Sequence, residues 1–337
     1  MTRLVNRTRG AAAWTVRYGV RAEERLVLAL RATWDIDRHG RLTAHEQEPE
    51  LTLVDTYRDD PATTSLAREA ELAPAKPATD LVVLASAIAP ARGTRQMGVT
   101  LACSGLLTST LHVHGERQWT KKLFGVGLTE AKPFERCELI WEYAAGGADA
   151  TSTPPASERR NPVGRGFRGT KSKLSLDEAP APRITAAPDD LETPVGWGFI
   201  APGWAPRADY GGTYDQAWQE ERFPLLPKDF DARFFQTAPP ALTAPGVLAG
   251  GPQLRVTGCH PEGDVGCTVP KLEVSARVMI GGESDRTCPL ALATILFEPT
   301  DRRLTLLWRG ELDIHRRLER MTEMEITATG DGLGVRA

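Results

Sequence analysis

The chain has 337 residues, enough for two average domains or for one large β-rich unit with long insertions. Apolar residues make up 41% and charged residues 25%, which is typical of a soluble globular protein. The formal net charge of −3 supplies no global basic field, so we expect neither nucleic acid nor a membrane among its partners.

The N-terminus carries no targeting signal that we can identify. Its first residues, "MTRLVNRTRGAAAWTV", lack the apolar run of a signal peptide. No segment approaches the ~18 consecutive apolar residues of a transmembrane helix. We therefore expect a cytoplasmic protein.

The five cysteines are odd in number, widely spaced and without a CxxC pair, which argues against a disulfide framework and a zinc ribbon. We expect most of them to be small buried residues. A bond between Cys259 and Cys267, on either side of "HPEGDVG", is the less favoured alternative.

Strand signals begin at Glu24–Asp37, a long apolar run that ends before Gly40, where a hairpin is expected. Ser65–Leu72 fits either a short helix with Ser65 as its N-cap or a loop turn. Thr79–Pro90, Arg95–Gly105 and Leu107–Trp119 then form three extended stretches.

The middle of the chain is rich in proline and small residues, particularly at Ala148–Arg160 and Ala179–Asp190. Proline recurs every few residues through much of Pro188–Pro240, which excludes long regular elements. This same part is rich in tryptophan, tyrosine and phenylalanine, whereas disordered chains are poor in aromatic residues. We therefore expect an ordered, irregular segment.

Strand patterns return at Lys271–Gly282 and at Leu290–Gly310, the latter a hairpin that turns at Glu298–Asp301. The sequence thus predicts a mainly β fold with antiparallel sheets, sandwich- or barrel-like, and little helix. We expect one unit over residues 1–337. It consists of a β-rich N-terminal half (1–147), an irregular aromatic-rich segment (148–245) and a C-terminal β part (246–337).

His112 and His114 are the best candidates for metal ligands. On a strand, residues i and i+2 share a face, so both imidazoles could point the same way about 7 Å apart. A third ligand would have to come from His260 or an acid such as Glu116. A metal-dependent hydrolase that uses the histidine pair is therefore the alternative function. The favoured interpretation is an exposed strand edge that leads into the "GERQW" turn.

Other motifs for chemistry are weak. "NPVGRGF" (Asn161–Phe167) lacks the Lys-Ser/Thr of a phosphate-binding loop and fits a tight loop with positive φ angles. No GxSxG, HExxH or SxxK motif is present. We expect no cofactor and no catalytic residues.

"GGTYDQAW" (Gly211–Trp218) predicts a short helical turn. Asp215 can cap it, and Tyr214 and Trp218 are four residues apart and share its face.

Several longer motifs carry a family resemblance. They are "KPATDLVVLASA", "GERQW", "PFERCELIWEYAAGG", "NPVGRGF", "GWAPR", "GGTYDQAW", "PLLPKDFDARFFQTAPP" and "LTLLWRG". With them the chain resembles a large domain-of-unknown-function family encoded beside type VI secretion spike genes. Its characterised members are adaptors that load a toxic effector onto the spike.

The resemblance implies a non-enzymatic, chaperone-like adaptor. Its expected partners are a secreted effector or the PAAR-type tip domain fused to it, and the VgrG spike trimer. The motif residues that the resemblance marks as structural are Gly115, Arg117, Trp119, Gly146, Gly147, Asn161, Pro162, Gly164, Gly166, Gly212, Thr213 and Asp215.

An adaptor needs aromatic and arginine anchors, because these bury large areas at low entropic cost. Six residues within 22 positions have this composition, and we expect most of them in the core with one or two exposed. The candidates for partner binding are Trp197, Trp204, Arg207, Tyr210, Tyr214 and Trp218.

Overall fold

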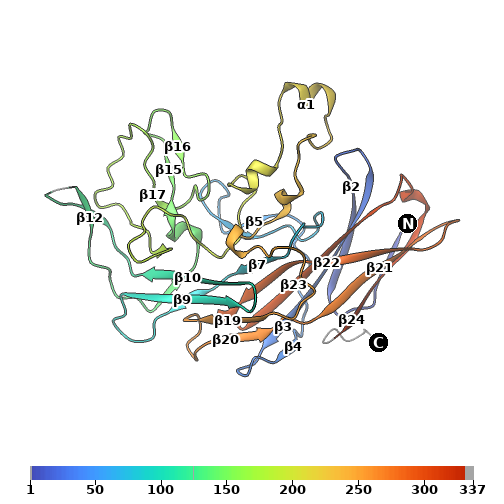
Figure 1. Ribbon diagram of the computed structural model, residues 1–337, viewed down its shortest axis with the longest axis horizontal. Coiled ribbons are helices and arrows are strands. Elements are labelled where there is room, and N and C mark those ends of the chain that lie inside the picture. The colour runs from blue at the N-terminus through green and yellow to red at the C-terminus, as the bar shows by residue number, and fades with distance from the viewer. Residues whose placement is uncertain (1, 124, 331–337) are drawn as a thin grey trace.

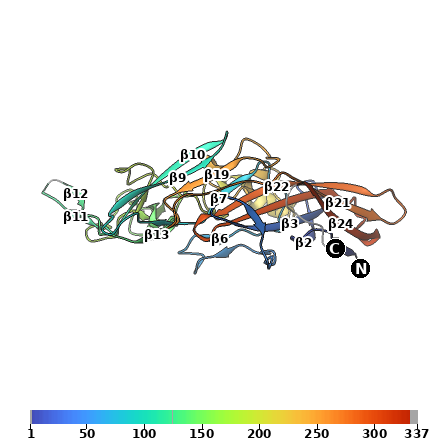
Figure 2. The same cartoon turned by 90° about the horizontal axis from the view of Figure 1, so that it is seen from below.

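Two mainly antiparallel sheets dominate the molecule (Figure 1), which confirms the predicted fold class. The computed structural model describes residues 2–123 and 125–330. Within these residues the larger sheet has nine strands and the smaller sheet has five. The molecule is long and thin when seen from below (Figure 2). The hairpin of β11 (Trp119–Lys121) and β12 (Val126–Leu128) lies at one end, and strands β21 (Leu272–Ile280) and β24 (Met321–Gly330) lie toward the other.

The larger sheet follows the order β1-β24-β21-β22-β23-β3-β2, with β4 added to β3 and β7 added to β22. Its edge strands β1 and β2 are consecutive in the chain and joined by a short turn, so the sheet is nearly closed and barrel-like. Its strands are β1 (Arg3–Asn6), β2 (Ala11–Tyr18), β3 (Glu24–Ile36), β4 (Leu42–Ala44), β7 (Asp80–Val83), β21 (Leu272–Ile280), β22 (Arg286–Glu298), β23 (Arg303–Asp313) and β24 (Met321–Gly330).

The smaller sheet follows the order β18-β10-β9-β19-β20. Like the larger sheet, it pairs strands from residues 1–147 with strands from residues 246–337, so the two β-rich parts are interleaved. Its strands are β9 (Gln96–Cys103), β10 (Leu107–His114), β18 (Ile184–Thr185), β19 (Gln253–Thr257) and β20 (Val265–Thr268).

The remaining elements are short. The paired strands are β5 (Thr56–Tyr57), β6 (Leu66–Arg68), β8 (Ser86–Ile88), β11 (Trp119–Lys121), β12 (Val126–Leu128), β13 (Arg136–Glu138), β14 (Ala145–Gly146), β15 (Ala148–Asp149), β16 (Ala156–Ser157) and β17 (Arg165–Gly166). The helices are α1 (Gln216–Glu221) and the 3-10 turns η1 (Trp141–Tyr143), η2 (Arg207–Tyr210), η3 (Ala232–Phe235), η4 (Pro240–Leu242), η5 (Pro299–Asp301) and η6 (Leu318–Arg320). Among the described residues, no helix is long and apolar enough to cross a membrane.

Both predicted hairpins form. Strands β3 and β4 turn where Gly40 has a φ of 80°, and β22 and β23 turn at η5. Of the two alternatives for Ser65–Leu72, the short helix is wrong, because Leu66–Arg68 form strand β6, which pairs with β5, and the rest of the segment is loop. The Ser65 N–H and hydroxyl both donate to the carboxylate of Glu142, 77 residues away, so Ser65 does not cap a helix.

All five cysteines are free and buried. Burial was predicted for most of them, and this is confirmed. Cys259 and Cys267 do not form a disulfide. Burial raises the pKa of both thiols to about 12, which keeps them protonated at neutral pH.

The irregular middle segment is held to the sheets by a buried cluster of charges centred on Lys76. The Lys76 Nζ lies 2.8 Å from a carboxylate oxygen of Glu69 and 2.7 Å from one of Asp80. Arg309 on β23 lies 3.0 Å from Glu69, and the Thr237 N–H of the middle segment donates to Asp80. These residues are all at most 4% exposed, so the cluster joins three parts of the chain inside the protein.

The charges in this cluster set the ionisation of Glu69. Burial alone would raise its pKa, but the cations of Lys76 and Arg309, together with hydrogen bonds from Lys76 and Thr294, lower the pKa to about 2. Glu69 therefore stays ionised in the folded protein far below the pH at which it would be protonated in the unfolded chain.

A second buried network fixes the loops that carry most of the motif glycines. The Asn161 side chain is fully buried and its Nδ2 donates to the carbonyls of Trp141 and Ala145 at 2.9 and 2.8 Å. A Cβ at Gly146 would lie 2.2 Å from the Asn161 carbonyl oxygen, and Gly146 also has a φ of 138°. Only glycine fits there without displacing the backbone.

Breaking the charge cluster should strongly destabilise the protein. Lys76→Met leaves Glu69 and Asp80 without their shared cation, and we expect the free energy of unfolding to fall by about 3–5 kcal/mol. Urea denaturation at pH 7 measures this. Lys228→Met is the control, because the Lys228–Glu221 pair is largely exposed and contributes little. Equal, small effects of both changes would contradict the structural role of Lys76.

The low pKa of Glu69 predicts loss of stability in acid. Its folded-state pKa lies below the ordinary value of 4.5, so the stabilisation is present above pH 4.5 and declines as the pH falls toward about 2. Denaturation at a series of pH values measures the slope. Glu69→Gln removes this titration, so that variant should be less stable at pH 7 but should lose less stability on acidification.

Asn161 should act as a donor and not merely as a packed side chain. Asn161→Ala removes the side-chain donor to the Ala145 carbonyl and one of the two donors to the Trp141 carbonyl, which still accepts from the Ala144 N–H, and we expect a loss of about 2 kcal/mol in thermal or urea unfolding. Asn161→Asp keeps the shape but turns an oxygen toward both carbonyls, so it should cost at least as much as alanine. An aspartate variant as stable as the wild type would contradict this role.

Candidate functional site

The six candidates for partner binding separate into a buried group and a surface group. Trp197, Trp204 and Arg207 belong to the core, with exposed fractions of 1%, 7% and 7%. The Trp197 Nε1 donates to Ser109 Oγ at 2.9 Å, and Arg207 donates to the carbonyls of Phe234 and Ile200. These three residues stabilise the middle segment, and their side chains present almost no surface to a partner.

Tyr210, Tyr214 and Trp218 lie on an arm, residues 210–235, which projects from the body and carries α1 near its end (Figure 1). Tyr214 is 56% exposed, and its ring makes an edge contact with Trp218 at a centroid distance of 4.8 Å. Phe223 is 68% exposed, and its ring makes an edge contact with Trp218 at a centroid distance of 5.7 Å. Together the half-buried Trp218 and the exposed Tyr214 and Phe223 form a set of three rings, which we call the aromatic cluster.

Hydrogen bonds fix the arm in place. Asp215 caps α1, as predicted, by accepting from the Trp218 N–H at 2.8 Å. The Thr213 N–H and hydroxyl both donate to Asp229, where Gly212 has a φ of 81°. Arg222 donates to the carbonyl of Val20 in the β2–β3 hairpin, which ties the arm to the larger sheet.

An apolar groove of about 600 Å³ lies between the arm and the tip of the β2–β3 hairpin. We call it the aromatic groove. The Phe230, Phe234 and Phe235 rings pack against one another at its base with centroids 5.5–5.8 Å apart. Tyr18, on the hairpin side, is 59% exposed. The residues that line it are Arg17, Tyr18, Gly19, Val20, Glu23, Arg25, Pro74, Ala75, Tyr214, Pro224, Leu225, Leu226, Phe230, Ala232, Phe234, Phe235 and Glu311.

Most of the other motif residues build scaffold. Gly147, Pro162, Gly164 and Gly166 lie in the loops around Asn161, and the Trp119 ring packs on Gly166. Arg117 donates through Nε and Nη2 to the Pro182 carbonyl at 3.0 Å. A Cβ at Gly115 would lie 1.7 Å from the Lys132 carbonyl oxygen, so the chain needs glycine there.

The histidine pair lies on β10, as expected, but His114 is buried and only 4% exposed, so the prediction of an exposed strand edge is wrong for this residue. Its Nε2 lies 3.3 Å from the Thr185 hydroxyl on β18. Burial, followed by the charges of Arg117 and His112, lowers the His114 pKa to about 4. Within residues 2–123 and 125–330, no group of three or more His, Cys, Asp or Glu side chains could hold a metal ion.

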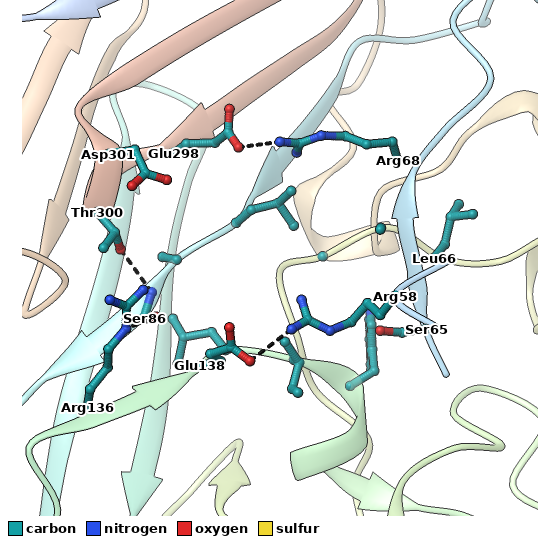
Figure 3. Close-up of a pocket in the computed structure, with 17 residues that line it drawn as sticks. Arg58, Ser65, Leu66, Arg68, Ser86, Arg136, Glu138, Glu298, Thr300 and Asp301 are labelled. Carbon is teal, nitrogen blue, oxygen red and sulfur yellow. Dashed lines mark hydrogen bonds and ion pairs between the residues drawn. The ribbon is translucent and has the colours of Figure 1, made fainter. Parts of the chain in front are cut away.

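A second, polar pocket of about 270 Å³ lies where β6, β8 and β13 meet the β22–β23 turn (Figure 3). We call it the arginine pocket, after Arg58, Arg68 and Arg136 in its wall. Arg58 pairs with Glu138 at 2.8 Å, and Arg68 pairs with Glu298 at 2.6 Å. The Arg136 Nε donates to Ser86 Oγ, whose backbone N–H donates in turn to Thr300.

Sequence reasoning did not single out these surface residues. Phe223 and Tyr18 were not among the candidates, because nothing local distinguishes an exposed ring from a buried one. The arginine pocket is assembled from segments up to 243 positions apart, from Arg58 to Asp301. Two of the motifs quoted for the resemblance reach it, through Leu84–Ser86 and Arg136–Trp141, and the β22–β23 turn that completes it lies just before a third, "LTLLWRG".

Comparison with known proteins identifies the family but not the activity. No curated protein and no solved structure matched the chain significantly. Residues 21–309 match a bacterial family described as "Uncharacterized protein conserved in bacteria (DUF2169)". The match spans well over half of the chain, and it includes the arm, the whole arginine pocket and the aromatic groove except for Arg17–Val20 and Glu311. The protein therefore belongs to the DUF2169 family.

Proposed function

We propose that the protein is a non-enzymatic adaptor of a type VI secretion system. It would bind a toxic effector, or the PAAR-type tip domain fused to it, in the cytoplasm and load it onto the VgrG spike. The motifs quoted above support this proposal through their resemblance to adaptors of that kind. Membership of the DUF2169 family is compatible with it.

The observation that carries the proposal is the aromatic cluster beside the aromatic groove. Tyr214 and Phe223 are more than half exposed, yet they stand on an arm that a helix cap, the Thr213–Asp229 bonds and Arg222 hold in one arrangement. Exposed aromatic side chains with few accessible conformations are typical anchors of protein interfaces. A groove of this size can take a few apolar side chains of a partner.

The proposal assigns binding to the surface group of the predicted residues. Trp218 contacts both Tyr214 and Phe223, and its Nε1 donates to the Leu225 carbonyl, which keeps the ring in place. Tyr210 is covered in part by Arg233, whose guanidinium lies 4.2 Å from the ring centroid. Tyr214 and Phe223 are therefore the residues whose loss should weaken binding without disturbing the core.

Co-expression with the effector encoded beside it should yield a stable complex that purifies intact. Tyr214→Ser combined with Phe223→Ser should weaken that complex by about tenfold or more, since anchor residues of an interface carry most of its energy. Affinity measured by calorimetry and thermal unfolding of the free adaptor test this together. Binding should fall while the melting temperature stays close to that of the wild type.

Val247→Ser is the matched control, because Val247 is 49% exposed and does not line the groove. It should leave binding unchanged. Separate recovery of the wild-type adaptor and the effector at micromolar concentration would contradict the proposed function. A complex that forms normally with the double variant would contradict the assigned surface.

A further inference from the structure

Two residues that line the arginine pocket carry a buried donor nitrogen that has no acceptor in the described part of the chain. Arg68 Nη1 and Trp141 Nε1 both belong to residues that line this pocket, and neither finds a hydrogen-bond partner among the described residues. Buried donors are almost always satisfied, because an unmade hydrogen bond costs the full desolvation of the group. Two such donors in one pocket point to a ligand that supplies acceptor oxygens.

The guanidinium groups are oriented for the same ligand. Arg58 and Arg68 each use one terminal nitrogen to bind an acid, and in Figure 3 the remaining nitrogens point into the space between the two side chains. Arg136 uses its Nε for the Ser86 hydroxyl and pairs with no carboxylate in the described part of the chain. Nitrogens of like charge that face one another favour an anion between them.

The charge of the pocket favours a carboxylate over a phosphate. Its lining carries three arginines and three acids, namely Glu138, Glu298 and Asp301, so the formal charge is zero. A doubly charged phosphate would lie close to three carboxylates. A carboxylate brings a single charge and accepts in-plane hydrogen bonds from guanidinium groups.

The volume of the arginine pocket and its opening to solvent limit which ligands it can bind. The volume of about 270 Å³ fits one side chain or a chain terminus, but no larger folded element. Arg58 and Glu138 are 37% and 47% exposed, so this side of the pocket opens to solvent. Leu66, Leu84 and Leu139 give the wall an apolar part that can contact the aliphatic atoms next to a carboxylate.

We propose that the arginine pocket binds a carboxylate of a polypeptide, with Arg68 Nη1 and Trp141 Nε1 as donors to its oxygens. The carboxylate is either an acidic side chain or a C-terminus, and the chemistry of recognition is the same for both. The choice of a polypeptide as its source rests on the proposed adaptor function. The choice of a carboxylate rests on the pocket alone.

The indole N–H resonance of Trp141 in an NMR spectrum reports directly on this site, and Trp141→Phe assigns it. The peptide probes titrated into the full chain are N-acetyl-alanyl-alanine with a free C-terminus, its C-terminal amide, N-acetyl-glutamate amide and N-acetyl-glutamine amide. Citrate and acetate are titrated as small acids for comparison. We expect one or both acids to move the resonance in a saturable manner. The uncharged glutamine probe should not move it.

Two glycine variants provide a matched pair. A Cβ at Gly198 would lie 3.6 Å from Trp141 Nε1 and 3.7 Å from Leu84 Cδ2, which is ordinary contact, so Gly198→Ala should fold and narrow the pocket in front of the indole nitrogen. A Cβ at Gly203 would meet nothing within 4 Å. We expect Gly198→Ala to weaken the binding of the acidic probe by about tenfold, and Gly203→Ala to leave it within about twofold.

Arg68→Gln removes the second donor and should also weaken binding by about tenfold. If that variant is unstable because Glu298 loses its partner, Gly198→Ala still tests the site. Binding of the acidic probes that neither variant weakens would overturn the proposal, as would the absence of a shift at millimolar acid.

The sources of the carboxylate are told apart by the probes. If alanyl-alanine moves the indole resonance and its C-terminal amide does not, the pocket binds a chain terminus. If glutamate amide moves the resonance, the pocket binds an acidic side chain. Both results support the proposal. Citrate or acetate binding more tightly than either peptide would overturn the assignment to a polypeptide.

This test and the test of adaptor function fail independently. A chain that forms the effector complex but shows no indole shift contradicts only the pocket proposal. A chain that shows the shift but forms no effector complex contradicts the adaptor proposal and leaves carboxylate binding supported.

Discussion

The fold depends on one buried charge cluster. Lys76 satisfies Glu69 and Asp80 at once, Arg309 shares Glu69, and Thr237 binds Asp80. Because buried charges are tolerated only when every partner is in place, the cluster requires the segment before β7, the middle of the chain and strand β23 to come together in one arrangement. An apolar core alone would allow those parts to shift against one another. The polar cluster specifies how they dock.

This docking explains why the irregular middle segment can be ordered with so little regular structure. Trp197, Phe199 and Trp204 anchor it in the core, while the Asn161 side chain donates to the buried carbonyls of Trp141 and Ala145. The segment can then present an arm whose exposed rings are not needed for packing. The buried contacts that hold the middle segment in place thus also leave the rings of the arm free to lie on the surface.

Much of the fold could be predicted from the sequence. Apolar, strand-like runs locate β3, β9, β10, β22 and β23, and glycine or proline marks their turns, because both signals are local. The sequence could not show which of the six aromatic and arginine candidates are exposed, because burial is decided by contacts with distant strands. Ser65 illustrates the limit: its local pattern fits a helix cap, but Glu142 binds it and a strand forms instead. The arginine pocket was missed for a similar reason, since its three arginines come from separate elements.

The near closure of the larger sheet has a consequence for how the chain folds. Strand β1 pairs in parallel with β24, so that Arg3 lies opposite Glu323. A contact between residues so far apart in sequence carries a large loop-closure entropy, and folds dominated by such contacts form slowly. During synthesis the first strands must wait for the last, with open edges on both sides of the unfinished sheet. Newly made chains are therefore most prone to aggregate before β24 leaves the ribosome.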